Sequence, residues 1–431
     1  MQSNSFTKQL KDSFNQSTIH QIARKQRFFQ RERKITPYNL LMALISAFAS
    51  EELASLADLQ RHYNLLNEEP VAYKPFHNQL AKKSFSNFMS EVAHYLFHQL
   101  AGKYIERDST GTFSEFDKVI IQDGTSFALH DGLSDVFPGR FSSVSPAAVE
   151  LHVAWDCQNN TFESLSLTKD TASERAYLPE ASSLSGSLLL ADAGYFSRDY
   201  IHQLQQAKAH FIMKVDSKIN PYIEQCFTPT RYNKKLTGEP LKSSFDFLSK
   251  EHPNDLDVHW QSLDGHWFVS RLIVSWNTKV KCFQYLVTNL PRHRYTCQRV
   301  IGAYRFRWQI ELLFKEWKSY SNLKKFNTQK AHIAEGLIWA SLIAALLKRL
   351  LAVKTQQLYQ VIISPIKVAN CSKVLLPELF LYLIKNSTTQ INNVLDRLFR
   401  FLKTNARRAH PKRDKVYGWD DIGFKPFYGE A

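Results

Sequence analysis

The spacing of apolar residues changes along the chain and divides it into segments of different type. Between residues 37 and 100 the apolar positions recur at helical spacing. The first run begins at Thr36-Pro37, where a capping threonine precedes a proline at the first helical position. This pattern predicts helices over 37–48, 55–63 and 76–100.

From residue 116 the apolar runs become shorter and follow the period of β-strands. Runs at 118–122, 186–191 and 210–215 predict buried strands, and alternation over 147–155 and 161–168 predicts a hairpin. Two of the buried runs are followed directly by a carboxylate, Asp123 after the first and Asp192 after the second. A carboxylate at the end of a buried strand is placed to reach a cleft.

The order of these elements predicts a fold. Three strands are followed by a polar helical piece at 172–178, the strand at 186–191, a helix capped by Ser197 and the strand at 210–215. This order, with acids closing the first and fourth strands, is that of an RNase H-like α/β fold with a mixed sheet. Residues 216–281 interrupt it with strand-like pieces around the turn Leu263-Asp264-Gly265, which predicts a β-rich insertion. Residues 283–289 predict one more strand.

The strongest helical pattern lies at residues 304–319, which contain no glycine or proline. At about 100° per residue, five apolar residues fall on one face and five polar residues fall on an adjoining stripe. The apolar residues are Phe306, Ile310, Leu313, Phe314 and Trp317, and the polar residues are Tyr304, Arg307, Glu311, Lys315 and Lys318.

The polar stripe combines one carboxylate with several cations and a phenol. Such a set suits a site that holds a divalent metal and phosphate oxygens together, because the carboxylate binds metal and the cations neutralise phosphate. Salt bridges on a solvated helix, from Arg307 to Glu311 and from Glu311 to Lys315, explain the same spacing. The stripe alone leaves both interpretations open.

The formal charge of +15 narrows the class of partner. The cations are spread through every region instead of lying on one amphipathic helix, which favours nucleic acid over a membrane. The most apolar run, 334–347, is shorter than the roughly 20 residues needed to span a bilayer. Five scattered cysteines without a C-x-x-C pair indicate neither a zinc knuckle nor a disulfide framework, and a reducing cytoplasm fits them.

Three blocks of residues resemble the insertion sequence 4 family of bacterial DDE transposases. The helical stripe resembles that family's Tyr-Arg-Glu-Lys signature, carried here by Tyr304, Arg307, Glu311 and Lys318. Residues 121–126 (IQDGTS) and 190–196 (LADAGYF) resemble the first and second catalytic blocks of the family. The resemblance covers residues 116–345 well and both ends poorly, and it departs at Ala193, where many relatives carry a basic residue.

The resemblance implies roles for these residues. Asp123, Asp192 and Glu311 would be the catalytic residues and the metal ligands for two Mg2+ or Mn2+ ions per active site. The DNA-binding residues would be Tyr304, Arg307, Lys315, Lys318 and Tyr285, with Tyr285 closest to where relatives place an aromatic ring that stacks on a displaced base. Other stacking candidates are Trp260, Trp267 and Trp276, and core packing remains open for all four aromatics.

We therefore expect four regions. They are a helical N-terminal DNA-binding region over 1–105, an RNase H-like catalytic domain over 106–215 and 282–345, a β-rich insertion domain over 216–281, and a helical, basic C-terminal region over 346–431. For the first region, a helix-turn-helix-like module and a plain helical docking domain both remain open.

The resemblance also implies a function, a transposase that cleaves and transfers DNA strands in cut-and-paste transposition of an insertion sequence. Its partners would be double-stranded DNA, in terminal inverted repeats and target, and a second copy of the chain in a synaptic complex. It would act in the bacterial cytoplasm, associated with the nucleoid and with no membrane. A stand-alone Mg2+-dependent DNA nuclease, and a non-catalytic DNA-binding inhibitor derived from a transposase, are the alternatives.

Overall fold

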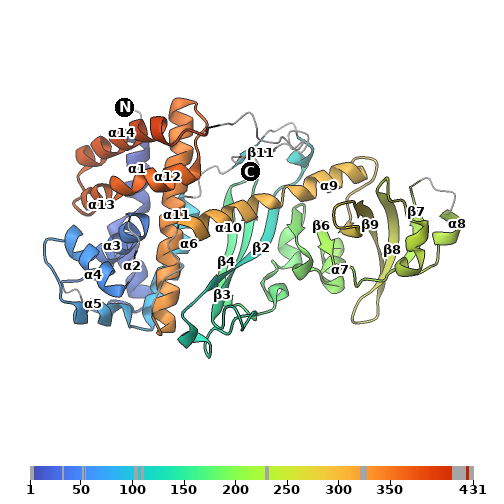
Figure 1. Ribbon diagram of the computed structural model, residues 1–431, viewed down its shortest axis with the longest axis horizontal. Helices are drawn as coiled ribbons and strands as arrows, with labels where there is room; N and C mark the ends of the chain where they lie inside the picture. Colours follow the sequence, from blue (N-terminus) through green and yellow to red (C-terminus); the bar gives the residue numbers. More distant parts are fainter. Residues whose placement is uncertain are drawn as a thin grey trace.

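A computed structural model describes residues 4–31, 34–50, 53, 55–100, 105–107, 111–228, 233–320, 328–409 and 424–426. The molecule is elongated, with a helical body at one end, a sheet across the middle and the strands of the 216–281 segment toward the other end (Figure 1). Three of the basic residues of the C-terminal region, Lys412, Arg413 and Lys415, lie outside the described residues.

The helical body combines both ends of the chain. Its helices are α1 (Asn4–Ser13), α2 (Gln16–Lys25), α3 (Pro37–Ser50), α4 (Leu56–Leu66), α5 (Tyr73–Leu80), α6 (Ser84–Leu100), α11 (Ala331–Tyr359), α12 (Pro365–Cys371), α13 (Leu376–Ile384) and α14 (Thr388–Asn405). Helix α11 packs against α6 and α3, α13 packs against α3, and α14 packs against α1. Edge-on ring contacts join Phe6 to Phe399 and Phe14 to Phe380. The two ends of the chain therefore share one hydrophobic core.

The predicted helix over 76–100 is two helices, because the chain turns at residues 81–83 between α5 and α6. The ammonium group of Lys82 donates to the backbone carbonyl of Phe28 and lies 4.9 Å from the ring centroid of Phe29. This anchorage to an earlier part of the chain stabilises the turn. The other two predicted helices are present as α3 and α4.

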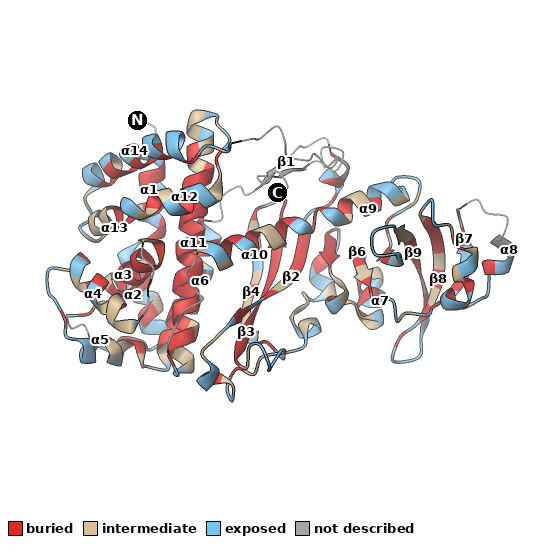
Figure 2. Ribbon diagram, viewed as in Figure 1, coloured by how far each residue is buried: buried red, intermediate tan, exposed pale blue. Residues whose placement is uncertain are grey.

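Helix α11 runs through the helical body and is buried along most of its length (Figure 2). Its 29 residues extend well beyond the apolar run at 334–347. By length and composition it is long and apolar enough to cross a membrane, although its most apolar window is entirely buried inside the protein.

Nine strands form one mixed sheet in the order β4-β3-β2-β5-β6-β10-β9-β8-β7. They are β2 (Val119–Ala128), β3 (Ala148–Asp156), β4 (Thr161–Lys169), β5 (Leu188–Ala191), β6 (His210–Val215), β7 (Tyr222–Cys226), β8 (Asn254–Gln261), β9 (Trp267–Asn277) and β10 (Cys282–Thr288). Strand β5 is parallel to both β2 and β6, and all other neighbours are antiparallel. A separate pair joins β1 (Ile105–Arg107) to β11 (Phe424–Pro426).

One strand boundary differs from the sequence pattern in a way that matters for the site. The run at 118–122 was expected to end at Asp123, but β2 continues to Ala128 because residues 123–128 pair with β3. Asp123 therefore lies within β2, beside the point where its other neighbour β5 ends. The polar piece at 172–178 is a 3-10 helix, η3 (Glu174–Tyr177). Ser197 occupies the N-cap position of α7 (Arg198–Gln206), but its side chain makes no capping hydrogen bond.

The strands of the 216–281 segment continue the core sheet. Strand β9 pairs with β10, and β10 pairs on its other side with β6. The predicted hairpin turn between β8 and β9 contains Gly265 at φ +88, a left-handed conformation that glycine adopts without strain. A short helix, α8 (Asn233–Leu236), lies near the outer edge (Figure 1).

The predicted continuous helix over 304–319 is interrupted. Helix α9 (Cys297–Arg305) ends, and α10 (Trp308–Tyr320) begins, on either side of Phe306 and Arg307. At the break, the Arg307 amide bonds to the carbonyl of Tyr304, three residues back, as in a 3-10 turn. Phe306 is fully buried and Arg307 is 8% exposed, so both point into the protein. The apolar face predicted for this segment is buried throughout.

Candidate active site

The register of the parallel strands places Asp123 beside Asp192. The last pair between β2 and β5 is Gln122 with Ala191, and each aspartate is the next residue of its segment. Ala191 also pairs with Met213 of β6, so Lys214 follows in the same row. The Nζ atom of Lys214 lies 3.9 Å from Oδ1 of Asp192. Asp123 and Asp192, which are 69 positions apart in the sequence, therefore lie side by side where the parallel strands end.

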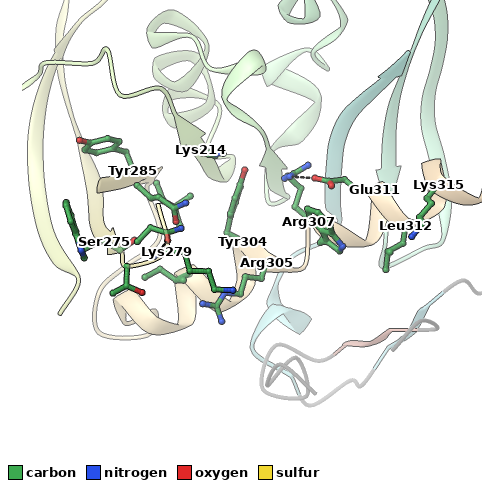
Figure 3. Close-up of a pocket in the computed structure, with 17 residues that line it drawn as sticks. Lys214, Ser275, Lys279, Tyr285, Tyr304, Arg305, Arg307, Glu311, Leu312 and Lys315 are labelled. Atoms are coloured by element: carbon green, nitrogen blue, oxygen red, sulfur yellow. Dashed lines mark hydrogen bonds and ion pairs between the residues drawn. The ribbon is translucent and has the colours of Figure 1, made fainter. Parts of the chain in front are cut away.

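Helix α10 brings the third predicted acid to this point. It packs across β2, and the break before it turns Arg307 toward the sheet. The guanidinium group of Arg307 donates through Nη2 to Oε1 of Glu311 at 2.5 Å, and through Nη1 to Oδ2 of Asp123. Figure 3 shows the contact between Arg307 and Glu311. One buried cation therefore bridges two of the three acids.

Tyr304 completes the contacts to the acids. Its hydroxyl donates to Oδ1 of Asp192 at 3.1 Å, and the guanidinium carbon of Arg307 lies 5.7 Å from its ring centroid. Burial raises the pKa of Tyr304, so this hydroxyl keeps its proton and remains a donor. The tyrosine and the arginine of the helical stripe thus both contact the predicted metal ligands.

The acids respond differently to this environment. Burial raises the pKa of Asp123 to about 7, and the charges of Asp192 and Glu311 add to the rise, against the opposing effects of Arg307 and the Gly124 amide. Asp192 has the opposite net shift. Burial acts against its ionisation, but Arg307, the Ala193 amide, Lys214 and Tyr304 together hold its pKa below the usual range. Three carboxylates, Asp123, Asp192 and Glu311, thus share two contacting cations, Arg307 and Lys214.

The three acids have the ligand chemistry of a divalent-metal site, because carboxylate oxygens are the donors that Mg2+ and Mn2+ prefer. As the side chains are placed, however, no group of three or more His, Cys, Asp or Glu residues in the described part of the chain surrounds a common point. The guanidinium of Arg307 stands between Asp123 and Glu311. This cation therefore already lies between two of the three carboxylates, which agrees with the excess of carboxylates over contacting cations.

A groove of about 1010 Å³ extends from Glu311 toward the β9–β10 hairpin (Figure 3). Its basic lining residues are Lys214, Lys279, Arg305, Arg307 and Lys315, and its aromatic lining residues are Trp276, Tyr285, Tyr304 and Trp308. The arrangement of cations and rings beside a cluster of acids suits a strand of nucleic acid, whose phosphates and bases need both.

The predicted DNA-binding residues occupy different surroundings. Lys315 is exposed and lines the groove. The ammonium group of Lys318 lies 5.7 Å from the ring centroid of Phe127 on β2, on the face that packs against the sheet. Tyr285 lines the groove but is only 4% exposed, because β10 packs it into the core beneath.

The three tryptophan candidates differ in exposure and in whether they line the groove. Trp276 lines the groove, whereas Trp260 is 4% exposed and donates to the hydroxyl of Ser270 within the insertion. Trp267 is 55% exposed but does not line the groove. Sequence reasoning passed over Trp308 as a groove residue, although it is half exposed and directly follows Arg307. A large apolar residue on the polar stripe of an amphipathic helix was the signal for it.

The chain is similar to known proteins over most of its length. The family model described as "Transposase DDE domain" matches residues 114–347. The transposase for insertion sequence element IS1151 of Clostridium perfringens is 25% identical over 79% of this chain and 79% of its own length. The transposase for insertion sequence element IS231F of Bacillus thuringiensis subsp. israelensis is 23% identical over 95% of this chain and 93% of its own.

One solved structure is similar at a lower level. The piggyBac transposase, in a synaptic complex with hairpin DNA, covers 89% of this chain and 81% of its own at 11% identity, with a TM-score of 0.44. A score below 0.5 is too low to carry an argument about fold or mechanism.

Proposed function

Because this chain belongs to the DDE transposase family, as its match over residues 114–347 shows, we propose that it moves an insertion sequence by a cut-and-paste route. It would cleave DNA strands at the ends of the element and join the freed ends to target DNA. The observation that carries the proposal is the meeting of Asp123, Asp192 and Glu311 around Arg307 at the end of a basic groove.

The acids are the proposed metal ligands. Asp123, Asp192 and Glu311 would together hold two Mg2+ or Mn2+ ions. Bound there, the ions would supply an activated water or 3' hydroxyl and would stabilise the leaving oxygen of a displacement at phosphorus. The excess of carboxylates over cations supports this assignment, because divalent cations would neutralise it.

Arg307 would then have to exchange partners. Its contacts to Asp123 and Glu311 compete with any other cation for the same oxygens. A DNA phosphate is the anion that could take up the guanidinium in exchange, and phosphate is the partner that the family resemblance implies for this residue. Tyr304 faces the same exchange at Asp192.

DNA would run along the groove. Lys315 is exposed there and available to a phosphate, and we propose the same role for Lys318 at the other end of the acid cluster. For a displaced base, Tyr285 is the aromatic that the resemblance implies. Its burial means that a base would first meet the half-exposed ring of Trp308.

The remaining parts of the proposal concern architecture. We propose that the catalytic core is RNase H-like, which the antiparallel β4-β3-β2 unit followed by parallel β5 and then β6 supports. Under this proposal the helices of residues 1–105 bind the element's ends, the 216–281 strands form the insertion, and two copies pair the two ends in the bacterial cytoplasm. The helical body built from both chain ends would carry end binding as one unit.

Cleavage of the inverted repeats that flank the coding region tests the proposal. Purified protein with Mg2+ should nick and then cut DNA that carries these repeats, and it should join a pre-cut end to a target plasmid. Cutting without joining would favour a stand-alone nuclease. Binding without cutting, at any concentration of Mg2+ or Mn2+, would favour a non-catalytic inhibitor.

A further inference from the structure

A glycine follows each of the two aspartates closely, and each glycine makes room for a glutamate. A Cβ atom on Gly124 would lie 2.6 Å from Oε1 of Glu150. A Cβ atom on Gly194 would lie 1.6 Å from Oε2 of Glu174. Both distances are well below ordinary contact, so these two carboxylates press against the backbone beside Asp123 and beside Asp192.

One arginine holds both glutamates. Arg140 donates through Nη2 to Oε2 of Glu150 at 3.0 Å and through Nη1 to Oε1 of Glu174 at 2.9 Å. Its backbone amide donates to Oδ2 of Asp170 at 2.7 Å, and the other oxygen of Asp170 accepts from Ser126 of β2. We call Arg140, Glu150 and Glu174 the arginine clamp. It joins the β2–β3 connection, strand β3 and η3 at one point.

The clamp lies on the face of the sheet opposite the acids. Successive side chains of a strand point to opposite faces, so Gly124 faces away from Asp123. Glu150 pairs with Ser126, two residues along β2 from Gly124 and on the same face. The clamp therefore cannot touch DNA in the groove or the oxygens of Asp123, and it acts on the backbone between them.

A second contact links the same elements. The hydroxyl of Tyr195, in η5 (Ala193–Tyr195), lies 3.2 Å from Nδ1 of His152 on β3, and the His152 ring stacks on Tyr177 of η3 at 4.1 Å between centroids. The hydroxyl of Tyr195 would also lie 3.1 Å from a Cβ atom on Gly124. The segment that carries Asp192 is thus packed onto the strand pair that carries Asp123.

Burial makes the clamp depend on its arginine. Glu150 is 4% exposed, and burial raises its pKa to about 7, while Arg140 acts in the opposite direction. Glu174 is more exposed and contributes a further negative charge nearby. Two carboxylates that would otherwise repel each other are held at a fixed separation by the planar, two-sided guanidinium group.

We propose that Arg140 is a positioning residue that sets the spacing between Asp123 and Asp192 by gripping Glu150 and Glu174 behind the two glycines. The inference rests on the proposed function, in which these aspartates share divalent ions. Groups that orient metal ligands from outside the coordination shell typically change metal affinity by about 10- to 100-fold. A lysine would replace this arginine only in part, because its single ammonium nitrogen cannot reproduce two separate nitrogen donors, one for each glutamate.

Binding of Mn2+ to the full-length protein, followed by electron paramagnetic resonance without DNA, tests the clamp directly. Arg140→Met should weaken Mn2+ binding about tenfold or more, and Arg140→Lys should weaken it by an intermediate factor. Arg175→Met is the matched control, since Arg175 is exposed in the same 3-10 helix as Glu174. End-DNA binding and the midpoint of thermal unfolding are measured on the same samples, because a purely stabilising ion pair would lower the midpoint and leave Mn2+ affinity unchanged.

A double replacement separates the clamp from general packing. Gly194→Ala should weaken Mn2+ binding because its new methyl group displaces the Glu174 carboxylate from Arg140. In a Glu174→Ala background the same methyl group has nothing to displace, so Gly194→Ala should add no further loss. Additive losses would overturn the clamp. If Arg140→Met does not fold, the Gly194 and Glu174 variants still provide the test.

The metal role of the aspartates and the positioning role of Arg140 are tested by different variants. If Asp123→Asn does not weaken Mn2+ binding, the proposed metal role of the aspartates is wrong, whatever Arg140 does. If Asp123→Asn weakens binding but Arg140→Met and Gly194→Ala leave it unchanged, the aspartates hold metal without the clamp and the inference about Arg140 is wrong. Weakening by all three variants, with the Arg175→Met control unchanged, supports both.

Discussion

Two carboxylates that pair with arginines, Asp123 and Glu316, differ in the charges that surround them. Asp123 contacts Arg307, which lines the groove, whereas Glu316 lies between α10 and α11 and accepts from Arg349 at 2.8 Å. Burial raises the pKa of each to about 7. For Glu316 the one opposing charge is Arg349. For Asp123, the neighbouring charges of Asp192 and Glu311 raise the pKa further, and Arg307 is shared with Glu311.

Because both carboxylates have a raised pKa, the number of neighbouring charges, and not the pKa shift, distinguishes the proposed active site from the structural pair. Glu316 and Arg349 pair with each other between two helices, at 6% and 3% exposure. The three acids outnumber the two cations that contact them, and one of the acids, Glu311, lines the basic groove. A cluster of carboxylates with too few neighbouring cations lowers stability, and a bound cationic ligand relieves the repulsion between them.

Removing an acid from each region should therefore have opposite effects, and this is the largest difference that we expect. Asp123→Asn, Asp192→Asn and Glu311→Gln should each reduce Mg2+-dependent cleavage of end DNA to the level of a no-protein control. Because burial raises the pKa of Asp123, Asp123→Asn should not lower the free energy of unfolding in urea, whereas Asp192→Asn should lower it slightly, since its neighbours stabilise the ionised form of Asp192. Gel-based cleavage and urea unfolding on the same preparations check both statements. A variant that still cleaves would remove its residue from the proposed site.

The structural pair should behave in the reverse manner. Glu316→Ala leaves the Arg349 guanidinium buried without its partner, which typically lowers the free energy of unfolding by about 3–5 kcal/mol. The double variant Glu316→Met/Arg349→Leu should recover most of that loss, because no unpaired charge remains. Urea unfolding measures both.

An exposed ion pair is the control for this prediction. Glu378 and Arg397 pair at 3.0 Å with side chains 33% and 53% exposed, so Glu378→Ala should cost less than about 1 kcal/mol. Equal losses for Glu316→Ala and Glu378→Ala would show that burial does not govern the α10–α11 pair.

The sequence predicted the acids of the site better than the setting that holds them. Asp123 and Asp192 each follow a short apolar run, and the parallel register of β2 and β5 then brings them together. Glu311 was found through its spacing from Arg307 on one helix. Placing the three acids together needed only local patterns and the family resemblance. Which of their neighbours contact them was not visible in those patterns.

Features that depend on distant contacts were missed for that reason. The break between α9 and α10 contains no glycine or proline that would predict it. It arises where the side chains of Phe306 and Arg307 both turn into the protein. The pairing of β9 with β10, which joins the 216–281 strands to the core sheet, is likewise set by tertiary packing. Arg140, Glu150 and Glu174 are single charged residues in separate segments, and no local pattern connects them.

The arginines should also differ in what they bind. Arg307→Met should weaken end binding several-fold and reduce the slope of log affinity against log salt by about one, because a phosphate contact is lost. Arg349→Met should lower stability without changing that slope, since Arg349 is 3% exposed and paired with Glu316. Fluorescence anisotropy over a salt series measures the slope. An unchanged slope for Arg307→Met would mean that its ion pairs to Asp123 and Glu311 are purely structural.

The smallest expected difference appears in the pH dependence of stability. The pKa of Glu316 rises from 4.5 to about 7 on folding, so the stability contributed by its neutral form is complete below pH 4.5 and is lost as the pH rises through 7. Relative to Glu316→Gln, which cannot titrate, the wild-type protein should lose roughly 1 kcal/mol or more of unfolding free energy between pH 5 and pH 7. Asp123 shifts in the same direction, so wild type should lose stability relative to Asp123→Asn over the same range. Saturating Mn2+ should remove the second difference, because bound carboxylates stay ionised, and should leave the first unchanged. If Mn2+ altered both differences or neither, the contrast between an open, ligand-binding cluster and a sealed pair would not hold.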